Sequence, residues 1–229
     1  MVERILVYER DLFFLLNGSD SPFFDRFMWL LSGKVVWLPL AVFILWVLLY
    51  KKNWRESVLI LLGIVLVVTL CDQFASHLCK PLFARPRPTH HPDFMYQVKT
   101  VFDYRGGQYG FISSHAANAF GFATFMSLIF RYRLFSWTVF LWATLNAYTR
   151  VYLGVHFVSD IVPGAMVGVF FGWLVYRLYI MVRPAVTACP DKDTSALYST
   201  SEKRMIVYAI FITILLIAVF NVPLVGWLR

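Results

Sequence analysis

Three residues in one largely apolar stretch have the types and spacing that phosphoryl transfer needs. They are Arg150, His156 and Asp160, within the segment 149–160. Four residues apart on a helix, His156 and Asp160 share one face, so the carboxylate can accept the proton of one imidazole nitrogen. The other nitrogen then keeps a lone pair for nucleophilic attack. Arg150 offers a planar, permanently charged guanidinium that suits a phosphate.

The same residues have a simpler explanation. A polar pair buried in a membrane can serve only to pack two helices together. Two earlier stretches bear on the choice. The first runs from Lys80 through Pro-Leu-Phe-Ala-Arg-Pro to Arg87-Pro88, and the second is Ser113-Ser114-His115, which opens an apolar run.

In chain order the three stretches read Lys-x6-Arg-Pro, Ser-Ser-His and Thr-Arg-x5-His-x3-Asp. This order resembles the three-part signature of the type 2 phosphatidic acid phosphatase (PAP2) family of membrane lipid phosphatases. The second family motif usually reads Pro-Ser-Gly-His, where this chain has Ile112 for Pro and Ser114 for Gly. Thr149 stands where the third motif usually has Ser. The charged and histidine positions all match.

The resemblance implies a metal-independent phosphatase without a cofactor, acting through a phosphohistidine intermediate. In this mechanism His156 attacks phosphorus and Asp160 orients it, while His115 protonates the leaving oxygen and then activates water. Three cations and two serines would hold the phosphate oxygens, where transition-state charge is spread: Lys80, Arg87, Arg150, Ser113 and Ser114. Candidate substrates are phosphatidic acid or phosphatidylglycerol phosphate, undecaprenyl pyrophosphate, and a lipid A phosphate.

Other polar residues show no such pattern. Four basic or histidine residues have no partner at motif spacing, and we expect them to play no part in the site: His77, Arg85, His90 and His91. Cys71 and Cys79 fall roughly 12 Å apart along one expected helix, which is too far for a disulfide. With Cys189 in a polar loop, we expect neither a disulfide framework nor a metal-ligand set.

Composition places the chain in a membrane. Of its 229 residues 59% are hydrophobic and only 15% charged, with a mean hydropathy of +0.65, which excludes an ordinary soluble domain. The net charge of +8 could indicate a nucleic-acid partner. Many Lys and Arg residues instead flank apolar spans, so we expect lipid headgroups and no nucleic acid.

We expect an all-α, polytopic membrane protein, with residues 1–229 forming a single domain. Residues 1–20 have mixed charges and apolar residues at helical spacing, which predicts an interfacial helix. Apolar runs predict a bundle of six transmembrane helices at about 30–50, 57–79, 114–130, 134–153, 157–180 and 205–228.

Six spans bring all three motifs to one membrane face. Tight basic clusters lie in short turns on the other face, so we expect the motifs to be extracytoplasmic and the polar loop 181–204 cytoplasmic. The expected location is the bacterial inner (plasma) membrane, with the site on the periplasmic side. The long loop 81–112 is rich in aromatics, including Phe94, Tyr96, Phe102 and Tyr104, and could form a lipid entrance.

Two alternatives use the same basic pocket. An anion transporter would bind phosphate without hydrolysing it, and would show inverted repeats and interrupted helices in both halves, which this sequence lacks. A lipid phosphotransferase would share every residue with the phosphatase. Nothing in the sequence indicates an oligomeric state.

Overall fold

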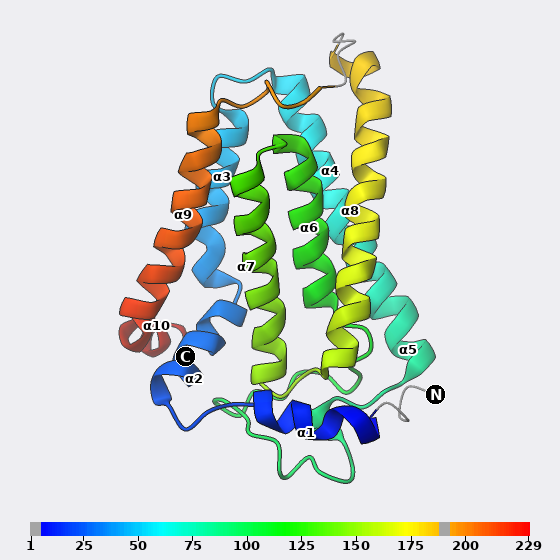
Figure 1. Cartoon of the computed structure of the whole chain (residues 1–229), viewed down its shortest axis with the longest axis vertical. Coiled ribbons are helices and arrows are strands. Elements are labelled where there is room, and N and C mark those ends of the chain that lie inside the picture. Colours follow the sequence, from blue (N-terminus) through cyan, green and yellow to red (C-terminus); the bar gives the residue numbers. More distant parts are fainter. Residues whose placement is uncertain (1–5, 188–192) are drawn as a thin grey trace.

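The computed structural model describes residues 6–187 and 193–229, and in these ranges the chain is a bundle of helices (Figure 1). The expected all-α class is confirmed there. The described residues contain a single isolated β-bridge, between Pro86 and Tyr109.

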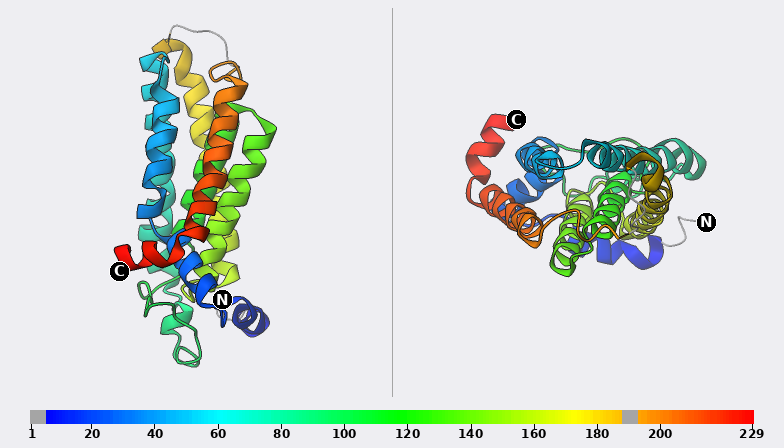
Figure 2. Two further views of the ribbon diagram at one scale, coloured as in Figure 1. Left: turned by 90° about the vertical axis from the view of Figure 1, so that its left-hand side faces the viewer. Right: turned by 90° about the horizontal axis from the view of Figure 1, so that it is seen from above.

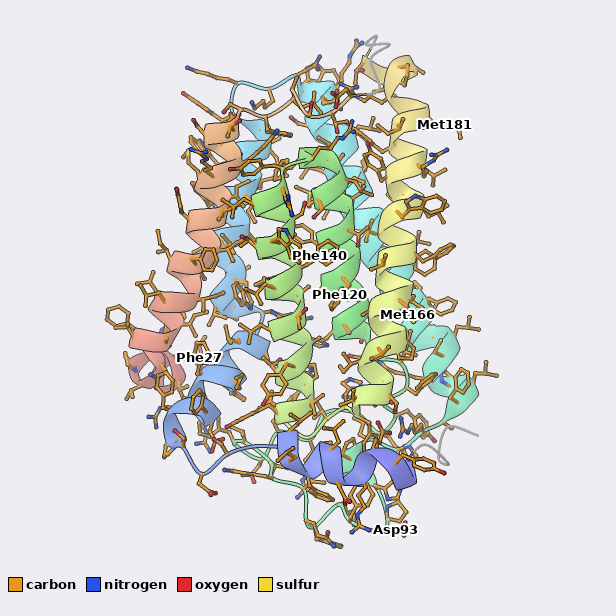
Figure 3. The ribbon with its side chains drawn as sticks, viewed as in Figure 1. Phe27, Asp93, Phe120, Phe140, Met166 and Met181 are labelled. Atoms are coloured by element: carbon orange, nitrogen blue, oxygen red, sulfur yellow. The ribbon has the colours of Figure 1, made fainter. Side chains whose placement is uncertain are left out.

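Within the described ranges, two helices are each long and apolar enough to cross a membrane. One is the 30-residue helix Trp54–Phe83, formed by α4 (Trp54–Gln73), the π-helical stretch η3 (Phe74–Cys79) and α5 (Lys80–Phe83). The other is α8 (Val158–Thr187), also 30 residues long. Its Met166 and Met181 side chains are 68% and 76% exposed, as suits a lipid-facing surface (Figure 3).

Two further spans are possible if bent helix pairs are each taken as one crossing. α2 (Pro22–Ser32) meets the 3-10 turn η2 (Val35–Trp37) and α3 (Leu38–Leu49) at 71°, and α9 (Thr200–Val219) meets α10 (Asn221–Leu228) at 82°. α6 (Ser114–Phe130), with 17 residues, and α7 (Arg133–Tyr152) do not qualify as spans by length and hydropathy. The expected count of six spans is therefore not confirmed.

Local sequence explains both bends. Gly33 ends α2, and its N–H donates to the carbonyls of Trp29 and Leu30. At the second bend Pro223 has no N–H to continue the helix from Val219. Asn221 then stabilises the corner by accepting a hydrogen bond from Arg26 Nε at 2.7 Å. The apolar runs around positions 30–50 and 205–228 therefore do not form straight helices.

Close packing of α8 against the central helix α6 sets the geometry of the site. Gly164, Gly168 and Gly172 recur every four residues on the α8 face that meets α6. A Cβ atom on Gly168 would lie 2.3 Å from the carbonyl oxygen of Ala117, and one on Gly164 would lie 2.6 Å from that of Ser113. The start of α6 is thereby held beside the start of α8.

At the far end of the bundle a buried ion pair joins α4 to α8. Arg183 Nε donates to Glu56 Oε2 at 2.9 Å, and Tyr179 also donates to Glu56. This contact explains why α8 continues to Thr187 rather than ending at Ile180 as expected. Cys71 and Cys79 are free thiols, as expected, and Cys189 lies outside the described residues.

The motifs lie at the opposite end. There α1 (Leu6–Leu16), the observed part of the expected interfacial helix, crosses beneath the ends of α7 and α8 (Figure 1). The loop between α5 and α6 covers the same end and contains the 3-10 turn η4 (Pro88–His90) (Figure 2). α5 occupies the first residues of the expected 81–112 loop, so this loop begins after Phe83.

Candidate active site

His156 and Asp160 form the centre of the site. His156 lies between α7 and α8, and Asp160 lies in the first turn of α8. The imidazole Nδ1 is 3.3 Å from Asp160 Oδ2, and the two side chains are 1% and 0% exposed. Asp160 Oδ2 also accepts the Phe157 amide at 3.0 Å, which fixes the carboxylate at the start of the helix.

Arg87 contacts the opposite nitrogen of the imidazole. Its Nη1 atom is 3.3 Å from His156 Nε2 and 3.2 Å from the Val155 carbonyl oxygen. A guanidinium can only donate, so Nε2 accepts this hydrogen bond and the ring proton belongs on Nδ1, facing Asp160. Burial, followed by the charges of Arg87, Arg150 and Lys80, holds the pKa of His156 well below its usual value. The ring is therefore neutral and nucleophilic near pH 7.

A short extended segment delivers two arginines to this place. Residues that precede proline favour extended backbone, and both Arg85 and Arg87 are followed by proline. Arg87 N donates to the Gln108 carbonyl at 3.0 Å, and Gly110 N donates to the Arg85 carbonyl at 2.9 Å. Because residues two apart in extended chain share a face, both side chains reach the site.

Gly110 lies directly against the catalytic pair. A Cβ atom there would be 3.0 Å from Asp160 Oδ2 and 3.6 Å from His156 Nδ1. The missing side chain thus lets the loop backbone cover the pair closely.

Arg150, at the last turn of α7, is 2% exposed and joins three elements. Nη1 donates to Ser32 at the end of α2, and Nη2 donates to the Tyr104 hydroxyl at 2.9 Å. His115 lies within electrostatic reach of both Arg150 and His156. The guanidinium is thereby fixed near both histidines.

Lys80 reaches the site from α5. Its ammonium is 3.3 Å from Ser114 Oγ and 3.1 Å from Ser76 Oγ, and Ser76 donates in turn to Asp72 at 3.3 Å. Asp72 thus acts on Lys80 through one hydroxyl. Lys80 therefore belongs to the same cluster as Arg87 and Arg150, whose charges act on it.

The two serines have different surroundings. Ser113 is fully buried and is the N-cap of α6, since its side chain accepts from the Ala116 amide and its own amide donates to the Asp160 carbonyl. Ser113 is therefore occupied in joining α6 to α8, and the structure does not bring it to the cavity as a phosphate ligand. Ser114 and His115 face the cavity instead.

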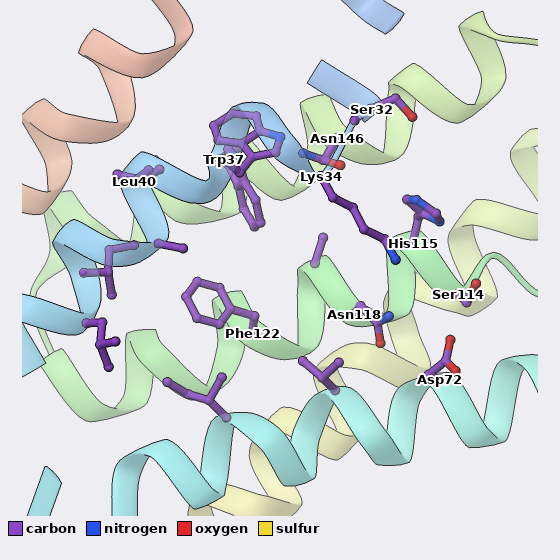
Figure 4. A pocket seen from close by; sticks show the side chains of 18 of the residues that line it. Ser32, Lys34, Trp37, Leu40, Asp72, Ser114, His115, Asn118, Phe122 and Asn146 are labelled. Atoms are coloured by element: carbon purple, nitrogen blue, oxygen red, sulfur yellow. The ribbon is translucent and has the colours of Figure 1, made fainter. Parts of the chain in front are cut away.

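This cavity of about 630 Å³ lies between α3, α4, α6 and α7 (Figure 4). Most of its wall is apolar, including Trp37, Leu40 and Phe122. One end is polar and is formed by Lys34, Asp72, Ser114, His115, Asn118 and Asn146. From Asp72 to Leu61 it follows α4 for roughly 16 Å, close to half of the roughly 30 Å hydrocarbon core of a bilayer.

The expectation that Arg85 plays no part in the site is wrong. Its guanidinium is 2% exposed and donates to Asp160 Oδ1 at 2.8 Å and to Glu9 Oε1 at 2.5 Å. Sequence spacing missed Glu9 because it lies on α1, far away in the chain. The proline on either side of Arg87 was the signal that could have identified Arg85. By contrast, His90 contacts Thr89 and His91 stacks on Phe94, so both lie within the loop.

The aromatic loop also differs from expectation. Phe94 is only 2% exposed and packs with Phe13 and Phe157 in a buried cluster, so it cannot be part of a lipid-facing wall. Tyr96 is 86% exposed, and the Tyr104 hydroxyl accepts a hydrogen bond from Arg150 Nη2, which links the loop to the site. The high content of aromatic residues in this loop did not by itself show which of them are buried and which are exposed.

Comparison with known proteins identifies the family of this chain. The family model of the PAP2 superfamily matches residues 57–184, which include all three motifs. The chain belongs to the PAP2 superfamily. A lipid A 4'-phosphatase of Porphyromonas gingivalis is 44% identical over 206 residues, covering 89% of this chain and 87% of the relative. One of Bacteroides thetaiotaomicron is 39% identical, covering 85% of each chain.

Solved PAP2 structures share the fold. The crystal structure of Aquifex aeolicus LpxE matches with a TM-score of 0.56 at 26% identity, covering 74% of this chain and 95% of that one. The PAP2 type phosphatidylglycerolphosphate phosphatase of Bacillus subtilis matches with a TM-score of 0.57 at 21% identity, covering 76% of this chain and 86% of that one. The protein is a membrane lipid phosphatase, which excludes the transporter alternative.

Proposed function

We propose that this PAP2 phosphatase removes the 4'-phosphate of lipid A or of a lipid A precursor. Two relatives named lipid A 4'-phosphatases match most of the chain at 44% and 39% identity, which supports this substrate over the other candidates. The structural observation that carries the proposal is the cavity, whose polar end contains His115 and whose apolar wall extends into the bundle.

The cavity fits an acylated substrate. Its length along α4 approximates the depth of one bilayer leaflet, so an acyl chain can lie in it while the phosphate is held beside its polar end, where Ser114 contacts Lys80 and His115 lies near His156. Lys34 is exposed and lines that end, where it can contact polar groups of the sugar. A water-soluble phosphate ester would leave the apolar wall unused.

His156 is the proposed nucleophile. Its Nε2 attacks phosphorus as the bond from phosphorus to the sugar oxygen breaks. Asp160 accepts a hydrogen bond from Nδ1–H and stabilises the positive charge that develops on the ring. A phosphorus atom can approach Nε2 only if Arg87 moves from its 3.3 Å contact onto a phosphate oxygen. Arg87 thus gives up its hydrogen bond to the neutral imidazole for one to the anionic phosphate, and the hydrogen bond to the anion is the stronger of the two.

His115 is the proposed acid and base. It protonates the leaving sugar oxygen and then activates the water that hydrolyses the phosphohistidine. Lys80, Arg87, Arg150 and Ser114 bind the equatorial oxygens, and Ser113 keeps the start of α6 in place.

We further propose that the reaction is metal-independent. In residues 6–187 and 193–229 no three His, Cys, Asp or Glu side chains are grouped to hold a metal ion, while three cations are present to neutralise phosphate. A single domain in the inner membrane with a periplasmic site is the arrangement we propose, because lipid A phosphate is a cell-envelope lipid and basic clusters lie at the other end.

Phosphate release from defined lipids in detergent tests the substrate. The panel holds lipid A phosphorylated at position 1 only, at position 4' only, and at both, with phosphatidylglycerol phosphate and undecaprenyl pyrophosphate. We expect loss of the 4'-phosphate, detected as the loss of one phosphate mass, from the lipid A phosphorylated at position 4' only and from the one phosphorylated at both positions. The lipid A phosphorylated at position 1 only should stay intact. Faster release from undecaprenyl pyrophosphate or phosphatidylglycerol phosphate would refute the lipid A assignment.

A further inference from the structure

An acidic residue on the N-terminal helix is connected to the catalytic pair. Glu9 lies on α1 and is 7% exposed. It accepts hydrogen bonds from Arg85 Nη2 at 2.5 Å, from the Ser159 amide at 3.0 Å and from the Ser159 hydroxyl at 2.6 Å. Burial of a carboxylate is costly unless its oxygens are hydrogen-bonded, and here three donors satisfy them. Glu9 is therefore a specifically bound side chain and not an ordinary surface residue of α1.

Arg85 continues the connection. Its Nη1 donates to Asp160 Oδ1 at 2.8 Å and to Ser159 Oγ at 2.6 Å, and its guanidinium lies 4.3 Å from the centre of the Phe157 ring. Since Oδ1 of Asp160 is taken by Arg85, the other oxygen, Oδ2, is the one that faces His156 Nδ1 at 3.3 Å. Glu9, Arg85, Asp160 and His156 therefore form one continuous chain of contacts.

α1 is fixed on both sides of Glu9. Phe13, one turn along, is fully buried and its ring centre lies 5.2 Å from that of Phe157. Asn17, a further turn along, donates to the carbonyls of Tyr152 and Lys99 at 2.9 and 3.0 Å. The inner face of α1 thus contacts the chain just before and just after His156.

We propose that Glu9 and Arg85 are positioning residues for His156, so that α1 is a component of the active site rather than only an interfacial anchor. This inference rests on the proposed roles of His156 and Asp160. An arginine paired with Asp160 alone would cancel its charge, whereas Glu9 shares that arginine and leaves the three side chains with a net charge of −1. That charge stabilises the imidazole as it becomes positive in the phosphohistidine.

Glu9→Gln tests the proposal, because it keeps the side-chain shape and removes the charge. We expect kcat to fall on the order of tenfold, as slight misplacement of a reacting group costs up to about 100-fold, with KM and the melting temperature in detergent unchanged. The matched control is Asp11→Asn, an exposed acid on the same helix, which should keep wild-type kcat. Wild-type kcat in Glu9→Gln, or a change confined to KM, would overturn the proposal.

A double-mutant cycle separates positioning from a general loss of packing. If Glu9 acts through Arg85, the double variant Glu9→Gln/Arg85→Gln loses no more activity than Arg85→Gln alone. If the fold losses in activity of the two single variants multiply in the double variant, the two residues act independently, which would contradict the proposal that Glu9 acts through Arg85. Should Glu9→Gln fail to fold, Ser159→Ala removes the hydroxyl that bridges Glu9 and Arg85, and a fall in kcat is again expected, with wild-type kcat as the contrary result.

A failure of the proposed role of Glu9 can be told apart from a failure of the proposed function. Activity is compared with wild type on a short phosphate ester as well as on the lipid. A wild-type protein that released phosphate from neither would refute the phosphatase assignment, and an active wild type with unaffected Glu9→Gln would refute only the role of Glu9.

Discussion

Arg87 Nη1 lies 3.3 Å from His156 Nε2, on the side of the imidazole opposite Asp160. The ring is thus held between a donor on one nitrogen and a carboxylate on the other. This arrangement selects the tautomer that leaves the Nε2 lone pair directed at the phosphate-binding cations. We therefore propose two roles for Arg87, one toward His156 and one toward the phosphate.

The first prediction concerns pH. Because the pKa of His156 is lowered by burial and then by Arg87, its protonated form accumulates only well below the usual imidazole value of about 6.5. Arg87→Gln removes a nearby positive charge and so raises this pKa. We expect the acidic limb of kcat/KM to move to higher pH in Arg87→Gln than in wild type. Both proteins are measured on the same substrate, so that ionisation of the substrate affects the two profiles equally. An acidic limb at the same pH in both proteins would contradict its assignment to His156.

Gly106 provides a second prediction. Its backbone φ of +67° is one that residues other than glycine rarely adopt, and an added Cβ would lie 2.9 Å from Arg87 Nη1. Gly106→Ala should therefore displace Arg87 and lower kcat/KM by at least about tenfold. Nothing lies within 4 Å of a Cβ on the neighbouring Gly107, so Gly107→Ala is the control and should behave like wild type. Equal effects of the two substitutions would argue against a specific contact with Arg87.

Chelation provides the third prediction. The proposed charge neutralisation comes from Lys80, Arg87 and Arg150, so phosphate release should continue at the wild-type rate after dialysis against EDTA. In the control, magnesium is added back to a parallel dialysed sample, and its rate of phosphate release should be no higher. Activity that disappears in EDTA and returns with magnesium would show that the site uses a metal ion.

Gly168 provides a prediction about stability. A methyl group there would meet the Ala117 carbonyl oxygen at 2.3 Å, and backbone cannot move aside as a side chain can. We expect Gly168→Ala to lower the free energy of unfolding by about 1–3 kcal/mol. Gly226→Ala on α10 adds the same group where nothing lies within 4 Å, and should leave the melting temperature in detergent unchanged. A melting temperature as high for Gly168→Ala as for Gly226→Ala would refute the close packing of α6 and α8.

Local sequence was sufficient to predict parts of this fold. The apolar run from Ser114 to Phe130 predicted both ends of α6. The i, i+4 spacing predicted the His156–Asp160 contact. Each of these depends on residues close together in the chain.

The remaining features depend on distant residues. Glu56 on α4 lets α8 continue past its basic residues, and Asn221 on α10 is held by Arg26 on α2. Glu9 is 76 residues from Arg85, so no spacing rule relates them. Burial of Phe94 follows from α1 packing over the loop, which periodicity does not reveal.

The central claim is that His156 forms a covalent bond to phosphate. The most direct measurement is acid-free quenching of the protein during turnover of a ³²P-labelled lipid phosphate, followed by peptide mapping of the label. We predict an acid-labile label on His156 in wild type and none in His156→Asn. In His115→Asn the label should still form on His156, but it should appear and disappear more slowly, because His115 serves both steps. Label on another residue, or rapid phosphate release by His156→Asn, would contradict the account.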